Sequence, residues 1–399
     1  MGHKRTFTIP GFQFAGISAG IKESHLSDLA LIRSYPAATV VGAFTTNRIQ
    51  AAPILVSKRN IRSGRCSAVI INSGNANACT GKRGLRDTER MVAITARTLK
   101  VPSRQVLVCS TGKIGVPLPI DRLVRGIPKA VRSLDKRKMM AAARAILTTD
   151  KGPKVAFASG KIGGKKFRIA GFAKGAGMIE PHLATMLAFF VTDLSIERRL
   201  LNKIFQESVD QTFNRITVDG DTSTNDTVLL LANGVAQNKK ISPGSRAAFL
   251  FQKKLREVME ELALKIVEDG EGATKCVRIE VRGARNEEEA RKVCYAVGNS
   301  PLVKTSFYGE DPNWGRILAA AGRSGATLTP ETADIYYNEV CVMRRGVSTG
   351  SHLEFRAAKV MERGQFHVTI DLRRGKGSFW IWASDLTEDY VKLNSHYRT

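Results

Sequence analysis

Short apolar runs typical of buried strands alternate along this chain with amphipathic helical patterns, and this alternation constrains the fold more than any other feature. Apolar residues recur at helical spacing from Phe251 to Glu268, and Gly270 follows as a stop signal. Asn286 gives a second expected helix, through Val297, a capping-box-like start. Strands mixed with helices in this way predict an α/β (α+β) fold. The strand-like runs lie at Ala68–Ile71, Gln105–Val108, Val228–Leu231, Asp334–Val342 and Phe366–Leu372.

The size and apolar content of the chain indicate a globular protein. With 399 residues, 43% of them hydrophobic, it can bury a large core and form two or more domains. No apolar run reaches the length of about 18 residues that a membrane helix needs, and Met1–Thr6 lacks the apolar region of a signal peptide. The six cysteines form no C-x-x-C pair, which is typical of reduced thiols. We expect a soluble cytoplasmic protein with no membrane partner.

The formal net charge of +26 raises the alternative of a nucleic-acid-binding protein. The basic residues are spread along the chain, however, and only Lys161–Arg168 and Arg373–Lys376 form short clusters. The sequence contains no zinc finger, RNP aromatic signature or helix-turn-helix pattern. No His/Cys/Asp cluster has zinc spacing, and Asp219–Asp221 lacks the later glutamate of an EF-hand. We expect no specific nucleic-acid partner, no metal and no organic cofactor.

A threonine that follows a glycine-rich turn is the first candidate for chemistry. The turn is Lys174–Met178, and Thr185 comes shortly after it. If the bond between Ala184 and Thr185 is cut, the new α-amine, with a reference pKa of about 7.7–8.0, can take the proton of the Thr185 hydroxyl. One cleavage would then create both a nucleophile and its base. The alternative is that Thr185 is a small polar residue in a buried strand.

The segment Val108–Gly115 supplies the second part that acyl transfer needs. It is an apolar strand that runs into a glycine-containing turn at Thr111 and Gly112. Backbone N–H groups and the Thr111 hydroxyl can converge there on an oxyanion.

Over nearly its whole length the chain resembles the glutamate N-acetyltransferases of arginine biosynthesis, also called ornithine acetyltransferases. Many ordered matches carry this resemblance. They are Gly42–Arg48 with Ala51–Pro53, Asn72–Ala78, Ser110–Gly112, Thr148–Asp150, Asp219–Asp226, Glu271–Lys275, Gly309–Arg316, and the tail segments Asp389–Asn394 and Tyr397–Thr399.

The resemblance implies a self-cleaving precursor with a particular fold. Cleavage between Ala184 and Thr185 would give an α chain of residues 1–184 and a β chain of residues 185–399 that stay associated, and two such αβ units would pair as a heterotetramer. The implied fold is a layered α/β/β/α sandwich over residues 1–280. A smaller C-terminal α/β region, residues 281–399, would send its tail back to the active site.

The resemblance also implies a ping-pong reaction. Thr185 would attack the acetyl group of N2-acetylornithine while Thr111 and Gly112 hold the oxyanion, and glutamate would then take the acetyl group from the enzyme. The family's substrate-binding positions fall on Thr148, Lys174, Thr185, Glu271, Asn394 and Thr399. The sequence leaves open whether acetyl-CoA is a second acetyl donor and whether the enzyme serves a paralogous pathway.

Two of these positions have plainer interpretations that the sequence leaves open. Lys174 offers a positive charge to a carboxylate, but it can equally be a solvated turn lysine. Glu271 offers a negative charge to an ammonium group. It can equally be a solvated loop residue that comes after the helix ended by Gly270.

Several residues near the expected cleavage point depart from the family pattern. Glu180–Leu183 stands where an asparagine and a methionine commonly occupy the two positions before Ala184, and Ala176 replaces a frequent serine. These changes bear on how efficiently the chain is cut. We interpret His182 as a surface residue and not as a general base.

Two hydrolase classes remain as alternatives. Gly346–Gly350 fits G-x-S-x-G, but Ser351–Arg356 alternates like a strand, so we expect a hairpin turn there and not a nucleophile elbow. The self-cleaving aminopeptidases/amidases of the related fold are the closer alternative. They would use water where this chain would use glutamate, typically with a serine nucleophile.

Overall fold

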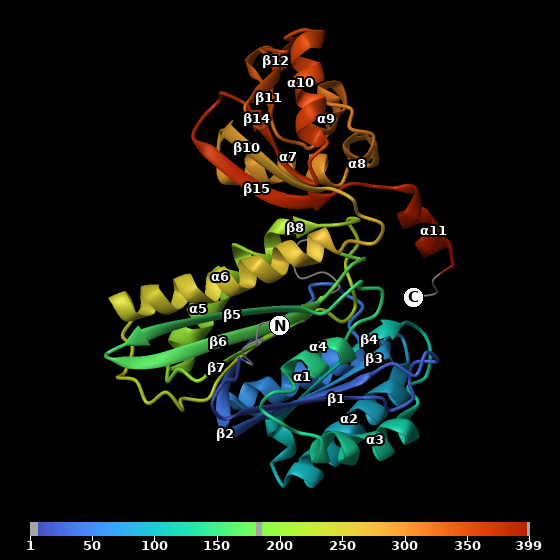
Figure 1. The fold of residues 1–399 in the computed structure, drawn as a ribbon, viewed down its shortest axis with the longest axis vertical. Helices are drawn as coiled ribbons and strands as arrows, with labels where there is room; N and C mark the ends of the chain where they lie inside the picture. Colours follow the sequence, from blue (N-terminus) through green and yellow to red (C-terminus); the bar gives the residue numbers. More distant parts are fainter. Residues whose placement is uncertain (1–6, 181–185, 397–399) are drawn as a thin grey trace, which may run out of the picture.

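The computed structural model describes residues 7–180 and 186–396, which form two parts with a sheet each (Figure 1). The first sheet has the strand order β4-β3-β2-β9-β7-β6-β5, and β1 also pairs with β2. Its strands are β1 (Phe12–Ile17), β2 (Leu29–Phe44), β3 (Arg65–Asn75), β4 (Val106–Lys113), β5 (Lys154–Ile162), β6 (Lys165–Lys174), β7 (Leu187–Thr192) and β9 (Thr227–Ala232).

The long strand β2 lets this sheet fold back on itself. Its first half pairs with β1 and β3 and its second half pairs with β9, with a shift of register between Arg33 and Ala38. The two halves of the sheet face each other across a shared core that contains Phe14, Ile71 and Phe189. The sheet therefore makes two stacked layers.

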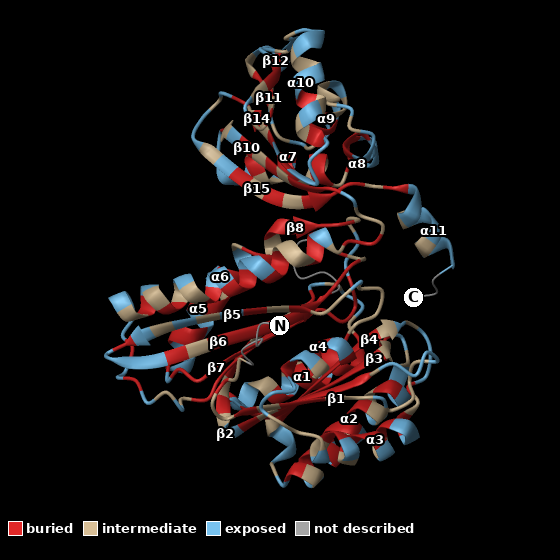
Figure 2. Cartoon of the chain, in the orientation of Figure 1, coloured by how far each residue is buried: buried red, intermediate tan, exposed pale blue. Residues whose placement is uncertain are grey.

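Helices cover the outer face of each layer. Along β7, Phe189 points into the shared core, whereas the next residue, Phe190, packs with Leu262 of α6. On the other side, Ile70 of β3 packs with Leu123 of α3. The sequence prediction of an α/β/β/α sandwich is confirmed, and Figure 2 shows the buried residues concentrated along its strands. The helices of this part are α1 (Ala52–Asn60), α2 (Gly81–Leu99), α3 (Ile120–Arg132), α4 (Met139–Ala145), α5 (Arg198–Asp210) and α6 (Arg246–Glu268), of which α4 packs into the shared core.

The second part has its own core, which runs from Val277 to Ala383. Its sheet has the order β13-β12-β11-β14-β10-β15-β8, where β8 (Ile216–Thr217) comes from the first part of the chain and pairs with β15. Position 280 lies inside β10, so we propose that the boundary between the parts falls ahead of Cys276. The remaining elements are α7 (Glu287–Gly298), α8 (Pro301–Tyr308), α9 (Trp314–Gly322), α10 (Ser351–Met361), α11 (Glu388–His396), β10 (Cys276–Ala284), β11 (Asp334–Tyr337), β12 (Val340–Arg344), β13 (Val347–Ser348), β14 (Gln365–Asp371) and β15 (Gly377–Ser384).

The helical predictions agree with the structure at their capping residues. The Asn286 side chain accepts the N–H of Glu289 at 2.9 Å at the start of α7. Helix α6 begins earlier than its apolar pattern does, because Ser245 accepts the N–H of Ala248 and caps it there. The expected strand Asp334–Val342 is in fact the two strands β11 and β12, which are joined by a turn at Asn338.

The strand expected after Ser348 is wrong, although β12 and β13 do pair as a hairpin just before it. Ser351–Met361 forms helix α10, whose buried residues Ala357 and Met361 lie four positions apart. Six alternating residues were too few to distinguish a strand from the exposed first turns of this helix, in which Phe355 is 64% exposed. Ser348 does lie between a strand and a helix, but its strand is short and exposed, and its hydroxyl donates to Glu354 at 3.0 Å.

The cysteines of the described residues are mostly buried thiols, as expected from their apolar neighbours. All six cysteines are unpaired, and only Cys79 among them is exposed. Within residues 7–180 and 186–396, every helix is too short or too polar to cross a membrane.

Candidate active site

One cavity of about 200 Å³ brings together predicted site residues from distant parts of the chain. The predicted residues that line it are Thr111, Gly112, Thr148, Lys174, Glu271 and Asn394. Ala184, Thr185, His182 and Thr399 lie outside the described residues. Strands β4 and β6 each end at this cavity, and helix α11 leaves the second part of the molecule and lies beside the first (Figure 1).

Backbone packing at the end of β4 fixes Thr111 and Gly112. Gly112 has φ +126°, and a Cβ there would lie 2.4 Å from the carbonyl carbon of Gly74 on β3, so this position requires glycine. The Asn225 side chain donates to the Ser110 carbonyl at 2.9 Å and holds the strand from the other side. Thr111 is only 4% exposed, and its hydroxyl lies at the wall of the cavity.

Lys174 is a buried cation, so the interpretation as a solvated turn lysine is wrong. It is the last residue of β6 and is 2% exposed. Its Nζ lies 3.5 Å from the Thr111 hydroxyl oxygen, to which it donates, and 4.0 Å from Asp150 Oδ2. Burial lowers the pKa of Lys174, while the nearby Asp150 opposes this shift. The Lys174 amino group thus stands next to the expected oxyanion site.

Asp150 organises this side of the cavity, although the sequence analysis gave it no role. Its carboxylate accepts the N–H of Gly175 at 2.7 Å, the N–H of Thr148 at 3.1 Å and the Nζ of Lys154 at 2.6 Å. Lys154 also pairs with Asp269. Burial alone would raise the pKa of Asp150, but Lys174, Lys154 and the hydrogen bonds bring it down to about 2.

Glu271 and the C-terminal helix close the opposite side. Glu271 is 9% exposed, and its Oε2 accepts the side-chain N–H of Asn394 at 2.9 Å, so it does more than follow a helix end. Tyr390, also on α11, lines the cavity and donates its hydroxyl to Asp219 at 3.3 Å. A carboxylate at this wall and a lysine at the other suit a substrate that carries both charges.

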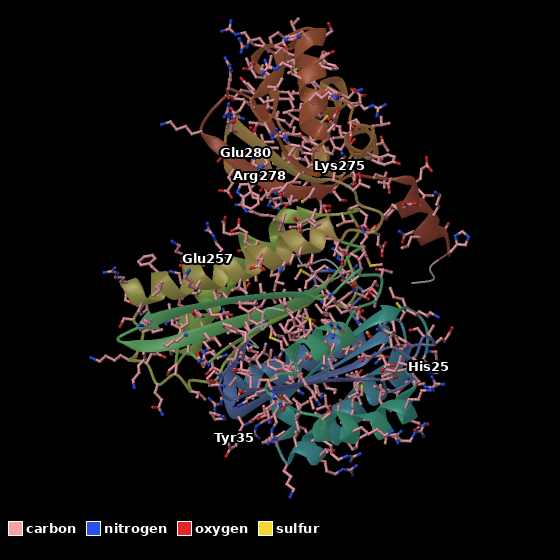
Figure 3. The ribbon with its side chains drawn as sticks, in the orientation of Figure 1. His25, Tyr35, Glu257, Lys275, Arg278 and Glu280 are labelled. Atoms are coloured by element: carbon pink, nitrogen blue, oxygen red, sulfur yellow. The ribbon has the colours of Figure 1, made fainter. Side chains whose placement is uncertain are left out.

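The Glu271–Lys275 motif joins the two parts of the molecule. Its last residue, Lys275, turns away from the cavity into the second part (Figure 3). There its Nζ donates to Glu310 at 2.5 Å and to the carbonyl of Met361 at 2.8 Å. Glu310 belongs to the Gly309–Arg316 motif, which therefore has a structural contact with the cavity segment.

Both sides of the expected cleavage point are anchored. On the upstream side, Asp219 accepts the N–H groups of Met178 and Ile179 at 2.6 and 2.8 Å. On the downstream side, Asp226 accepts the N–H of Met186 at 2.9 Å.

Glu180, four residues before Ala184, is held between the two parts of the molecule. Its carboxyl group accepts hydrogen bonds from Thr217 at 3.0 Å and Asn299 at 2.9 Å. Burial raises the pKa of Glu180 to about 7.

Comparisons with known proteins agree over nearly the whole chain. A family model described as the ArgJ family matches residues 13–399. The arginine biosynthesis bifunctional protein ArgJ of Geobacter sulfurreducens is 47% identical, over 98% of this chain and 100% of that protein. Its namesake from Caldanaerobacter subterraneus subsp. tengcongensis is 45% identical, over 98% and 97%. A crystal structure of ArgJ from Bacillus halodurans is 41% identical, covers 51% of this chain and 96% of that chain, and has a TM-score of 0.49.

A match of this length and identity identifies the family. The chain belongs to the ArgJ family, the bifunctional ornithine acetyltransferase and glutamate N-acetyltransferase enzymes of arginine biosynthesis.

Proposed function

We propose that this ArgJ enzyme moves the acetyl group of N2-acetylornithine to glutamate through an acetyl ester on Thr185. The observation that supports this most is the shared cavity, in which oxyanion donors, a buried lysine and a buried glutamate come together from three separate segments of the chain. Thr185 would become the first residue of the β chain when the bond after Ala184 is cut. Its α-amine would then act as the base for its own hydroxyl.

The walls of the cavity suit the charges that develop in acyl transfer. Negative charge on the acetyl oxygen would be met by the Thr111 hydroxyl and the Gly112 N–H, with Lys174 next to them. Because Lys174 donates to the Thr111 oxygen, the Thr111 O–H proton stays free to point at the substrate. Glu271, held by Asn394, would bind the ammonium group of ornithine.

We infer that the α chain, 1–184, and the β chain, 185–399, stay together because β6 of the first pairs with β7 of the second. Two such αβ units would form the enzyme in the cytoplasm. Thr148 and Thr399 would complete the substrate site, and acetyl-CoA would be a second acetyl donor in the bifunctional reaction.

Intact mass measured under denaturing conditions tests the central step. We expect two species, one that ends at Ala184 and one that begins at Thr185, together with transfer of acetyl from N2-acetylornithine to glutamate. A single uncut chain in an active preparation would remove the α-amine from the mechanism.

Replacing Thr111 by alanine should lower kcat strongly while the chain is still cut. Loss of one oxyanion donor typically costs about 2.7–4 kcal/mol of transition-state stabilisation, which is about a 100- to 1000-fold slower reaction. Steady-state kinetics with N2-acetylornithine measures this. A normal kcat in a correctly cut variant would show that Thr111 has no part in the chemistry.

Replacing Glu271 by glutamine should weaken substrate binding more than it slows the chemical step. A hydrogen bond to a charged group contributes about 1.5–3 kcal/mol, so KM for N2-acetylornithine should rise about 10- to 100-fold. Glu257→Gln is the matched control, since Glu257 lies exposed on α6 (Figure 3). An unchanged KM in Glu271→Gln would contradict the binding role.

A further inference from the structure

Asp226 is a buried acid beside the expected cleavage point, and the site described above does not use it. It immediately precedes β9, is 0% exposed and follows the cavity-lining residues Ser223–Asn225 without lining the cavity itself. Its Oδ1 accepts the N–H of Met186, and the next residue, Thr227, donates its own N–H to the Met186 carbonyl at 3.1 Å. Met186 is thus held on both sides of its backbone.

Among the residues that the structure describes, Asp226 Oδ2 has no hydrogen-bond partner. A buried acceptor without a partner typically costs about 1–3 kcal/mol, so its presence calls for a reason. Burial raises the pKa of Asp226 well above its usual value.

The neighbours of Asp226 do not supply the missing partner. Lys174 on β6 is the charged group that faces it. The Thr45 hydroxyl lies close enough to lower the pKa of Asp226, but it donates its proton to the Ser223 carbonyl at 2.6 Å. The nearest acceptors of Lys174 are the Thr111 hydroxyl and Asp150. Because Asp226 does not line the cavity, the ammonium group of a bound substrate does not reach it either.

Cleavage would turn the nitrogen of Thr185 into a stronger, chargeable donor. Hydrolysis of the bond between Ala184 and Thr185 adds one water: the hydroxyl goes to the Ala184 carbonyl and the hydrogen to the Thr185 nitrogen. The amide nitrogen, which has a single N–H and is not basic, thereby becomes an amine, which has two N–H groups and can take up a further proton. Met186 is bonded directly to Thr185, so the carboxyl group that accepts the Met186 N–H stands beside the start of the β chain.

We propose that Asp226 is a positioning residue for the mature enzyme, in which its Oδ2 accepts a hydrogen bond from the α-amino group of Thr185. This inference rests on the proposed function, because it needs the cut chain. Asn225, the preceding residue, holds β4 through the carbonyl of Ser110. Two consecutive residues therefore fix the oxyanion strand and the cut end relative to each other.

The test is Asp226→Asn, with Asp193→Asn as the matched control. Asp193 is also buried and follows β7, so it lies at the opposite end of the same strand pair, where it accepts the N–H of Arg168 at 2.8 Å. Cleavage is followed by intact mass, and kcat and KM are measured per cut chain across a range of pH. If Asp226→Asn does not fold, as judged by circular dichroism, Asp226→Ser takes its place.

We expect Asp226→Asn to lower kcat about 10- to 100-fold, as misplacement of a reacting group does, with KM within about twofold of wild type. A carboxylate raises the pKa of an adjacent amine, so its removal should move the acid limb of the kcat profile to lower pH by about one unit. A role in folding alone would leave that limb in place. Asp193→Asn should match wild type in both respects.

The outcomes separate this inference from the proposed function. Wild-type protein that is uncut yet active would overturn both. Cut, active wild type with an unchanged kcat and acid limb in Asp226→Asn would overturn the role of Asp226 alone. Equal changes in kcat and in the acid limb for the Asp193→Asn control would also overturn it. They would show that the effect comes from a less stable strand pair and not from the Thr185 amine.

Discussion

Replacing Thr185 by alanine should leave the chain uncut and abolish acetyl transfer. The alanine side chain has no hydroxyl, so neither the attack on the preceding peptide bond nor the attack on the acetyl group can take place. This is the largest effect we expect from any single change. Intact mass should give one species of 43.6 kDa, and the coupled assay with N2-acetylornithine and glutamate should show no transfer above background.

Thr185→Ser is the control for this result. Serine keeps the hydroxyl, so this variant should still be cut and should keep part of its activity. Because β6 and β7 pair over six positions, and both β7 faces are buried in separate cores, the fold itself should tolerate either change. Full activity in Thr185→Ala would exclude this residue as the nucleophile.

Much of the site could be predicted from sequence because its positions are marked by local pattern. Thr111 and Gly112 follow an apolar strand at a glycine-containing turn, and the structure shows that the turn requires glycine there. The Asn286 cap and the helix from Phe251 were predictable for the same reason, since capping and helical periodicity depend on residues close in sequence.

The missed features depend on contacts between distant residues. Nothing local distinguishes a solvated lysine from Lys174, whose burial comes from Asp150 and from β4. Asp226 directly precedes β9, whose residues 228–232 are all apolar, and a carboxylate next to such a run was a signal that could have been used. The helix at Ser351 was missed because its first turns are exposed and their alternation is accidental.

Loss of the Asp150 charge should cause the largest loss of stability. Asp150 lies between Lys154 and Lys174, all three side chains being less than 5% exposed. Removal of one partner from a buried ion pair costs about 3–5 kcal/mol, because the remaining charge stays buried without compensation. Asp269 still pairs with Lys154, so Asp150→Asn should lower the free energy of unfolding by about 3 kcal/mol, at the lower end of that range.

Urea unfolding at pH 7 and fixed protein concentration measures this loss. Asp121→Asn is the control, since Asp121 is 74% exposed and its pair with Arg90 is long, at 3.5 Å. Such a surface pair contributes at most about 1 kcal/mol. Equal midpoints for wild type and Asp150→Asn would show that the buried lysines find compensation elsewhere.

The pH dependence of the Asp150 contribution has a definite sign. The folded state holds the pKa of Asp150 at about 2, below its ordinary value of 3.8, so the unfolded chain takes up a proton first as the pH falls. The stability that the charge provides is therefore complete above about pH 5 and is lost as the pH falls through 3.8 towards 2. The gap between wild type and Asp150→Asn should accordingly be constant from pH 5 to 7 and close by about 2 kcal/mol in acid. A gap that widened in acid would mean that Asp150 is held as the neutral acid, and Lys174 would then lose its nearest counter-charge.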